Sequence, residues 1–255
     1  MKTVVRRILD VVLTAALLLL MSMQVTKQLA HEWIGIALFA LTILHQVLNR
    51  KYCAAIFKGK YTPLRVFRLT VNTLLLMTFV CTPLTGMMMS RYTTTFMNGW
   101  LKTSLVRQGH LALSHWSFVL MGVHLGLHFG VITGKLPKGK TRIASGAVMS
   151  GISVYGFYLF FQSNIFDYMF LKIPFAFLDY SKAWWQVIFE NLAMLLAWGF
   201  AAYLLSLFLK AIVKKDKRKT AVLFAVTLIV IIAAALILKT GLNPQTDSPS
   251  ASWAF

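Results

Sequence analysis

The sequence has little cysteine and no nucleotide-binding loop. Its 255 residues include two cysteines, Cys53 and Cys81, and no CxxC or CxxCH motif. Covalent attachment of c-type haem and cysteine ligation of an iron–sulfur cluster are therefore excluded. No glycine-rich loop of the GxGxxG or Walker type is present, so the chain carries no flavin or nicotinamide domain of its own.

Acidic residues are also scarce. Seven Asp and Glu stand against 26 Lys and Arg, which gives a formal net charge of +19. Such a charge can indicate nucleic-acid binding, but here the basic residues cluster in alternate short loops between long apolar runs, so no nucleic-acid partner is expected. Hydrophobic residues make up 58% of the chain, and the mean hydropathy is +0.70. These values predict an all-α, polytopic transmembrane helix bundle in a lipid bilayer.

The apolar runs predict about seven transmembrane helices, at residues 4–24, 30–48, 64–89, 105–133, 145–162, 183–209 and 220–238. Residues 1–212 are expected to form a six-helix membrane domain, and residues 213–239 a basic loop and the seventh helix. Residues 240–255 are expected to form a flexible extracytoplasmic tail. The start of the chain has no small-x-small cleavage site, so we interpret it as a retained first helix and not as a signal peptide.

Lys and Arg predict the orientation of these helices. Nineteen of the 26 lie at the N-terminus or in the segments that follow the second, fourth and sixth helices. The positive-inside rule makes these segments cytoplasmic, so the N-terminus is predicted inside and the tail outside. Tryptophans fall at the predicted outer helix ends, where an aromatic belt would place them: Trp33, Trp100, Trp184 and Trp185.

Histidine is the residue type that points to chemistry. Histidines are costly in a membrane and usually face a bundle interior, a partner or a cofactor. His31 and His45 lie on the second predicted helix, and His110 and His124 lie on the fourth at the same sequence spacing. This spacing of about four helical turns spans about 21 Å. Each helix can therefore present two stacked histidines within a hydrocarbon core of about 30 Å.

The two helices that carry these pairs are separated by one helix, so they run parallel and can place His31 opposite His110 and His45 opposite His124. Neutral imidazole ligates iron through Nε2 while a neighbouring acceptor holds Nδ1–H. Each helix also has a small residue one turn after its first histidine, Gly35 and Ser114, where a porphyrin needs room. The pattern predicts two bis-histidine b-type haems, with the four histidines as the axial ligands of the iron.

Other residues near these pairs allow more than one interpretation. His128 is in phase with His110 but lies one turn beyond His124, so its distance from His110 does not match the spacing on the second helix. A place beside a propionate or at a quinone site is therefore predicted for it in preference to ligation. A competing scheme uses His115 and His128 as ligands, although His115 lies about 140° from His110 around the helix. Arginines could pair with the anionic propionates: Arg107 on the outside, and Arg50, Arg65 or Arg68 on the inside.

Two further stretches are predicted to be structural. Gly122, Gly126 and Gly130 form a small-xxx-small stripe roughly opposite His124, which predicts close helix packing. Residues 164–182 form the longest outer loop and are rich in Phe and Tyr. This loop is expected to lie along the membrane interface as a short amphipathic segment.

Carboxylates are not expected near the histidines. Asp10 lies one turn from Arg6 and Arg7 and is expected to pair with them. Glu190 is a candidate for a proton-handling group at the outer surface. This absence of carboxylates counts against a histidine-dependent metal or proton transporter, which is the alternative from another functional class. A third class is a membrane anchoring or assembly factor without a cofactor.

Three stretches resemble the flavinylation-associated cytochromes, a family of bacterial membrane proteins similar to ferric reductases and other di-haem b cytochromes. They are HEWIGIALFALTILHQVLNRKY (31–52), HLALSHWSFVLMGVHLGLHFG (110–130) and FDYMFLKIPFAFLDY (166–180). The family pattern matches His31, His45, His110, His124 and His128, and it has an aromatic residue at the position of His115. The predicted helix 220–238 and the tail look like additions to the family.

The resemblance implies haem b and a multi-pass protein of the bacterial cytoplasmic membrane. It also implies transmembrane electron transfer from quinol, or from an inner-face donor, to an extracytoplasmic protein with covalently bound FMN. The chain would then be an electron-transfer component of an oxidoreductase system and not a stand-alone enzyme. The alternative within this class is the cytochrome b subunit of a quinone-linked dehydrogenase, hydrogenase or reductase complex.

Overall fold

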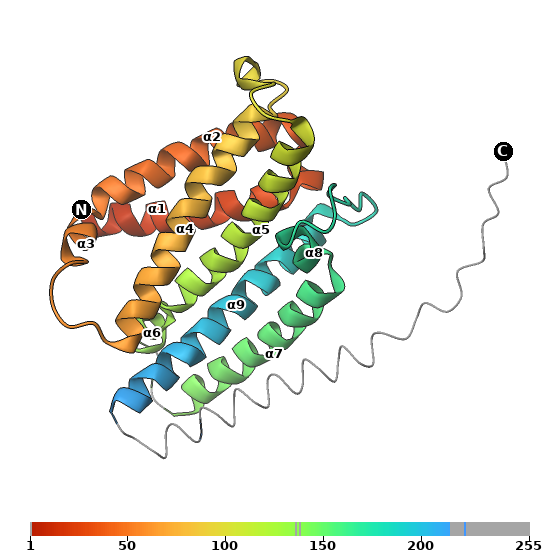
Figure 1. Cartoon of the computed structure of the whole chain (residues 1–255). Coiled ribbons are helices and arrows are strands. Elements are labelled where there is room, and N and C mark those ends of the chain that lie inside the picture. Colours follow the sequence, from red (N-terminus) through yellow and green to blue (C-terminus); the bar gives the residue numbers. More distant parts are fainter. Residues whose placement is uncertain (1, 136, 138, 215–221, 223–255) are drawn as a thin grey trace.

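The structure is a computed structural model that describes residues 2–135, 137, 139–214 and 222. In this part of the chain, all regular secondary structure is helical, as the composition predicts (Figure 1). The helices are α1 (Lys2–Met21), α2 (Met23–Leu48), α3 (Arg50–Ala55), α4 (Pro63–Met88), η1 (Thr95–Met97), α5 (Thr103–Gly126), α6 (Phe129–Thr133), α7 (Lys140–Gln162), α8 (Ile165–Met169) and α9 (Trp184–Val213).

The six long helices correspond to the first six predicted ones. The predicted helix 105–133 is divided, because α5 ends at Gly126 and α6 begins at Phe129. His128 therefore lies in the turn between two helices and not on the face of α5. The predicted helix 220–238, apart from Val222, and the tail 240–255 lie outside the described residues.

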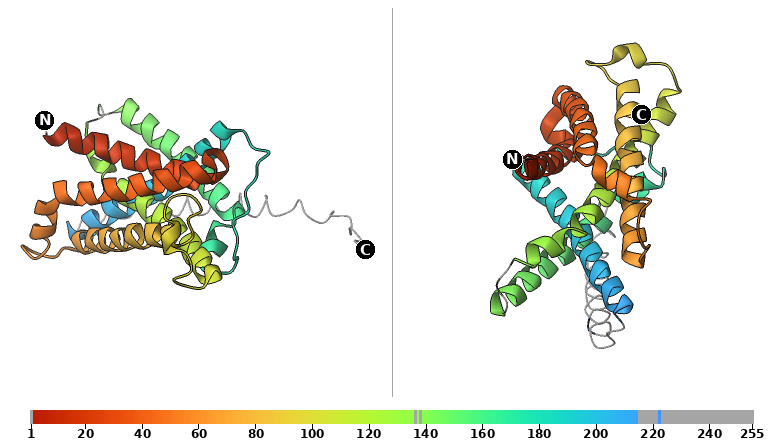
Figure 2. Two further views of the ribbon diagram at one scale, coloured as in Figure 1. Left: turned by 90° about the horizontal axis from the view of Figure 1, so that it is seen from above. Right: turned by 90° about the vertical axis from the view of Figure 1, so that its left-hand side faces the viewer.

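Successive long helices alternate in direction and form two ends of the molecule. The N-terminus, α3, α6 and the C-terminal end of α9 gather at one end, which we call the inner end after the predicted orientation (Figures 1 and 2). The α1–α2 turn, the loop 89–102 and α8 gather at the other end, the outer end. Helices α2 and α5 consequently run parallel, both from the outer to the inner end, as the sequence predicts.

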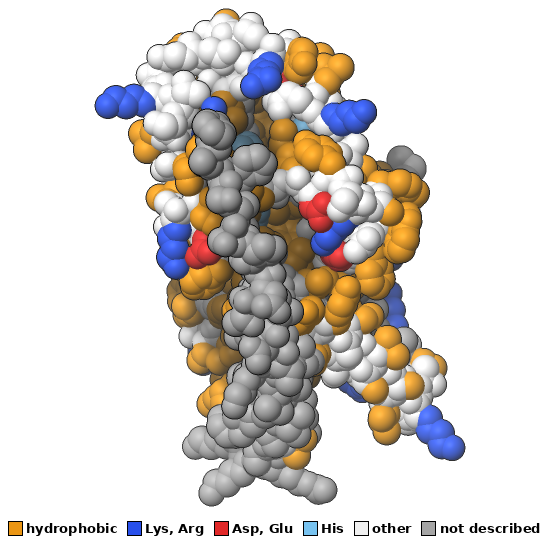
Figure 3. Space-filling view, turned by 90° about the vertical axis from the view of Figure 1, so that its right-hand side faces the viewer, with side chains coloured by type: hydrophobic (Ala, Val, Ile, Leu, Met, Phe, Trp, Pro, Cys, Tyr) orange, Lys and Arg blue, Asp and Glu red, His pale blue; other side chains and the backbone are white. Residues whose placement is uncertain are grey.

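Four helices, α2, α4, α7 and α9, are long and apolar enough to cross a membrane by length and composition. The other two long helices are more polar. Helix α1 carries Arg6, Arg7 and Asp10, and α5 carries three histidines. The chain thus has the character of a helical membrane protein. The face shown in Figure 3 is accordingly rich in hydrophobic side chains.

Glycines set the contact between α5 and α9. A Cβ atom at Gly122 would lie 2.7 Å from the Leu195 carbonyl oxygen, and one at Gly126 would overlap the backbone of Gly199. These two positions confirm the predicted packing role of the stripe. At Gly130 the nearest atom would be a ring carbon of Tyr203, 4.0 Å away, so this glycine is not needed for close approach.

The segment 164–182 begins with α8, a short helix with one buried side. Residues Ile165, Tyr168 and Met169 of α8 are buried, and the Trp116 indole donates a hydrogen bond to the Met169 carbonyl over 3.1 Å. The first part of this segment therefore folds against α5 because its apolar side chains find a protein surface there. Phe166 and Phe170, on the other side of this part, are exposed, and so are Phe177 and Tyr180 in the later part.

Candidate functional site

Four of the six histidines face one another between α2 and α5. Helix α1 packs along α2, and α4 packs along α5, whereas α2 and α5 have no extended backbone contact. Histidine side chains from both helices extend into the space between them. In Figure 3, histidine surface is visible at recessed positions among hydrophobic side chains.

His31 and His110 form the outer pair. Their ring centroids are 6.3 Å apart, and the ring planes are inclined by 72°. Two imidazoles that ligate one metal ion from opposite sides have centroids about 6 Å apart, since each metal–nitrogen bond is about 2 Å long. The separation of this pair therefore suits two axial ligands of one iron.

Helix α4 fixes the His110 ring. The His110 Nδ1 atom lies 3.0 Å from the Thr82 carbonyl oxygen and 3.2 Å from the Thr85 hydroxyl. A carbonyl can only accept, so Nδ1 carries the proton and Nε2 is left with its lone pair. Gly86 allows the approach, because a Cβ atom there would lie 3.1 Å from His110 Cε1. A metal-ligating histidine needs this tautomer.

His31 has no such partner. Its Nδ1 atom is buried and has no hydrogen bond to any described residue. The Leu20 carbonyl interacts with this histidine only outside hydrogen-bond geometry. A buried imidazole with an unpaired nitrogen is costly. A metal ion bound at Nε2 would fix the ring, and Nδ1 would still lack a partner.

The next residue, Glu32, holds the loop 89–102 in place. Its carboxylate accepts six hydrogen bonds of 2.7–3.2 Å: from the Gln28 amide, the Ser90 hydroxyl, the backbone amides of Arg91, Tyr92 and Thr93, and the Thr93 hydroxyl. Five of these six hydrogen bonds come from the loop that follows α4, so the carboxylate holds this loop against α2. This clamp lies beside His31, and nothing in the sequence analysis anticipated it.

His124 belongs to the inner pair and is held by Asn72 of α4. The His124 Nδ1 atom donates to the Asn72 side-chain oxygen over 2.9 Å, and the Asn72 amide nitrogen donates to the Tyr52 hydroxyl over 2.8 Å. This chain of contacts fixes the same tautomer as at His110. The ring of His128 lies 5.1 Å from that of His124, centroid to centroid.

His45 contacts a carboxylate. Its Nδ1 atom is 3.1 Å from Asp10 Oδ1, at ion-pair distance but outside hydrogen-bond angles. His45 also lies within electrostatic range of His124 and His128. Two expectations are corrected here. Asp10 does not form an ion pair with an arginine of its own helix, and a carboxylate does lie beside the histidines, because the fold of α1 against α2 brings it there.

His115 is separated from the other histidines. It is buried, its Nδ1 atom lies 2.7 Å from the Leu111 carbonyl oxygen, and its ring centroid is 5.0 Å from that of Tyr168 in α8. Its ring thus faces α8, whereas the ring of His128 faces His124. The competing scheme needs both rings to face α2, and the ring of His115 does not.

The three other outer candidates differ in their surroundings. Gly35 has ordinary space, because a Cβ atom there would meet only Leu20, at 4.0 Å. The Ser114 hydroxyl donates to the Leu111 carbonyl of its own helix over 2.9 Å. Arg107 is exposed, one turn before His110. None of the three has a hydrogen bond to His31 or His110, so their part in a haem site stays a prediction.

The inner arginines are distinguished by their partners. Arg65 donates to carbonyl oxygens of the loop before α4, those of Ala55, Ile56, Lys58 and Lys60. Arg50 is exposed. The Nε atom of Arg68, by contrast, is buried and unpaired among the described residues, and Arg68 lies within electrostatic range of His128.

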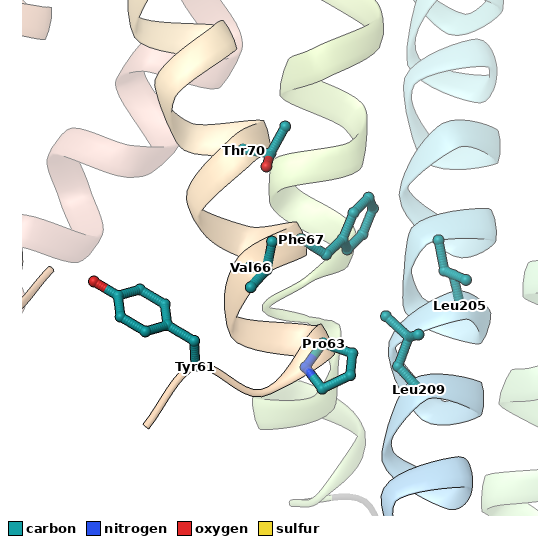
Figure 4. Close-up of a pocket in the computed structure, with 7 residues that line it drawn as sticks. All are labelled: Tyr61, Pro63, Val66, Phe67, Thr70, Leu205 and Leu209. Atoms are coloured by element: carbon teal, nitrogen blue, oxygen red, sulfur yellow. The ribbon is translucent and has the colours of Figure 1, made fainter. Parts of the chain in front are cut away.

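Among the described residues, those of the histidine pairs included, no group of three or more His, Cys, Asp or Glu side chains could hold a metal ion by itself. Each pair instead supplies two imidazoles, which suits a cofactor that brings its remaining ligands with it. An apolar groove lies at the inner half of the bundle between α4 and α9, on another face of α4 (Figure 4). Seven residues line it: Tyr61, Pro63, Val66, Phe67, Thr70, Leu205 and Leu209.

Known proteins give no independent assignment. A scan of protein-family models and searches of curated proteins and of solved structures found no match to this chain. Its function is therefore argued from the histidine pairs and their surroundings.

Proposed function

We propose that this chain is a di-haem b-type cytochrome that carries electrons across the bacterial cytoplasmic membrane. One observation carries the proposal. Parallel helices place His31 and His110 with their ring centroids 6.3 Å apart, and each helix has a second histidine, His45 or His124, at an equal sequence spacing toward the inner end. Axial ligation of iron by two imidazoles at each level fits this arrangement.

The side chains have distinct roles in this proposal. His31 and His110 would hold an outer haem, and His45 and His124 an inner haem. The Thr82 carbonyl and the Asn72 side chain orient their histidines and raise the basicity of Nε2. One-electron redox chemistry would come from the haem iron, and the protein tunes it by ligation and burial.

The proposed topology has seven spans with the N-terminus inside, which the distribution of basic residues supports. Electrons would enter from membrane quinol or from a protein at the inner face. They would leave to an extracytoplasmic protein that carries FMN. Strongly exposed aromatic residues at the outer end offer a surface for such a partner: Tyr92, Phe96, Trp100, Phe177 and Tyr180. Here Ser181 donates two hydrogen bonds to the Asp179 carboxylate and holds its pKa below the usual range, so a negative charge persists on this surface.

The first test is the visible spectrum of the purified protein. We expect a red protein with a reducible low-spin b-type spectrum and about two haems per chain. Protein that is colourless when produced in haem-sufficient cells, or that binds zinc stably in place of haem, overturns the proposal.

The second test addresses direction. In vesicles of known orientation, an impermeant acceptor added on the His31 side should reoxidise the reduced haems. Reoxidation only from the side that bears Lys214 would reverse the assignment. Neighbouring genes for an FMN transferase and an FMN-binding protein would support this acceptor, whereas genes for a quinone-linked dehydrogenase or hydrogenase would favour a cytochrome b subunit.

A second candidate function is proton transfer through the membrane, which the contact between Asp10 and His45 favours. It predicts colourless protein that conducts protons in liposomes, with conduction lost in the Asp10→Asn variant. A haem spectrum that depends on His45 separates the two proposals in favour of the cytochrome.

A further inference from the structure

Two arginines lie one helical turn below the inner histidines. On α4, Asn72 faces His124, and Arg68 precedes Asn72 by four residues, so both share one face of the helix. On α1, Asp10 contacts His45, and Arg6 precedes Asp10 by four residues. Both helices start at the inner end. Arg6 therefore lies about 6 Å nearer to that end than Asp10, and Arg68 lies about 6 Å nearer than Asn72.

Both guanidinium groups keep a donor without an acceptor. The Arg6 Nη2 atom donates to the Leu48 carbonyl over 2.6 Å, but the Nε atoms of Arg6 and Arg68 are buried and have no hydrogen-bond partner among the described residues. Buried unpaired donors on charged groups are costly. They mark a place where an acceptor fits.

The charge at this level is also unbalanced. Arg68 lies within electrostatic range of His128, Arg6 contacts the Leu48 carbonyl three residues after His45, and the carboxylate that faces these histidines is that of Asp10. The Asp10 carboxylate contacts His45 and forms no salt bridge with either arginine. An anion is therefore the group that completes this end of the site.

We propose that Arg6 and Arg68 bind the two propionate carboxylates of the inner haem, which places the edge of the haem that carries them toward the inner end. This inference rests on the proposed function. It assigns the contact to Arg68 and excludes Arg65, whose guanidinium is occupied by backbone carbonyls of the preceding loop. A guanidinium pairs with a carboxylate through two parallel hydrogen bonds, which the geometry of Arg favours over that of Lys.

The test compares Arg68→Gln with Arg65→Gln in the purified holoprotein by redox titration followed in the visible spectrum. A positive charge near the iron favours the reduced state. Arg68→Gln should therefore lower the midpoint potential of one haem and leave the other unchanged. Arg6→Gln should affect the same haem, and Arg68→Lys should restore most of the potential. Arg65→Gln, three residues away on the same helix, should leave both potentials unchanged.

Two results overturn the inference while the cytochrome assignment stands: unchanged potentials in Arg68→Gln, or an equal shift in Arg65→Gln, in protein that still holds two haems. A wild-type protein without haem overturns the proposed function itself. If Arg68→Gln loses its fold, the contact is tested in Arg68→Lys by the propionate bending bands of the resonance Raman spectrum. A shifted band supports the contact, and an unchanged band overturns it.

The phosphate of an anionic lipid headgroup could also bind these arginines. The lipid composition of the nanodiscs in which the potential is measured distinguishes this binding from a propionate contact. The shift in Arg68→Gln should be the same in nanodiscs of zwitterionic lipid and in nanodiscs that also contain phosphatidylglycerol. A shift that requires phosphatidylglycerol would assign the arginines to lipid and overturn the propionate contact.

Discussion

The outer and inner histidine pairs have the same spacing but different surroundings. At the outer pair, His110 donates to a neutral backbone carbonyl, and the neighbouring carboxylate of Glu32 is saturated by the loop after α4. At the inner pair, the Asp10 carboxylate contacts a histidine directly, and two arginines with unpaired donors lie one turn below. Each pair thus has a carboxylate beside it, but only at the inner pair does the carboxylate contact a histidine ring, and only there do arginines with unpaired donors lie close by.

This difference bears on how a protein can assign two tasks to two copies of one cofactor. Identical axial ligands give similar chemistry, so differences in potential must come from hydrogen bonds, charge and burial around them. The inner pair has three such groups that the outer pair lacks, Asp10, Arg6 and Arg68. We expect the inner haem to be the one whose potential responds to mutation of its surroundings.

The largest expected effect is loss of one haem on removal of a ligand. His124→Ala or His45→Ala should remove the inner haem, and His31→Ala or His110→Ala the outer haem, so the haem content falls from about two to about one per chain. His115→Ala is the matched control from the same helix and should keep both haems, because its ring faces Tyr168. Loss of a haem in His115→Ala, with retention in His110→Ala, would establish the competing ligand scheme.

A smaller effect is expected from the acceptor of His124. Asn72→Leu leaves the His124 Nδ1 atom without its hydrogen-bond partner, and loss of such a partner weakens metal-site affinity by about 10–100-fold. Haem release from the inner site on dilution measures this effect. Asn72→Asp keeps an acceptor and should retain the haem. Equal haem loss from both sites would show that Asn72 acts on the whole fold.

Removal of the negative charge beside the inner pair should shift the midpoint potential of the inner haem without loss of haem. Asp10→Asn removes a negative charge 3.1 Å from His45 Nδ1, so the oxidised iron loses stabilisation and the midpoint potential of the inner haem should rise. Glu32→Gln is the outer counterpart and should raise the outer potential by less, since that carboxylate is bound by the loop after α4 and forms no ion pair with His31. A shift in the midpoint potential of the outer haem in Asp10→Asn would contradict the proposed distinction between the two pairs.

The helix pattern and the histidine pairing could be predicted from the sequence because both depend on periodicity. Apolar runs predicted the six long helices, and the equal spacings predicted that His31 meets His110. The break between α5 and α6 could not be predicted from periodicity, because apolar residues continue across it and no proline marks it.

The surroundings of the histidines depend on contacts between helices that are far apart in the sequence. Asp10 pairs with His45 of the next helix, and Asn72 with His124 of the helix after its own. Local reasoning instead assigned Asp10 to its own helix. The sequence signal was the presence of polar residues, Asn72, Thr82 and Thr85, within an otherwise apolar predicted helix. Such residues in a membrane helix usually have a partner.

The smallest expected effects are those of alanine substitutions at two glycines beside the outer pair, Gly86 and Gly35. A Cβ atom at Gly86 would lie 3.1 Å from His110 Cε1, so Gly86→Ala should displace this ring by a few tenths of an ångström and broaden the outer haem's electron paramagnetic resonance signal without loss of haem. A Cβ atom at Gly35 meets only Leu20, at 4.0 Å, so the protein alone accommodates Gly35→Ala. If a porphyrin lies against this helix, as the sequence pattern predicts, Gly35→Ala should nevertheless weaken outer haem binding. Retention of the outer haem with wild-type affinity in Gly35→Ala would show that the porphyrin lies against α5, at Ser114, and not against α2.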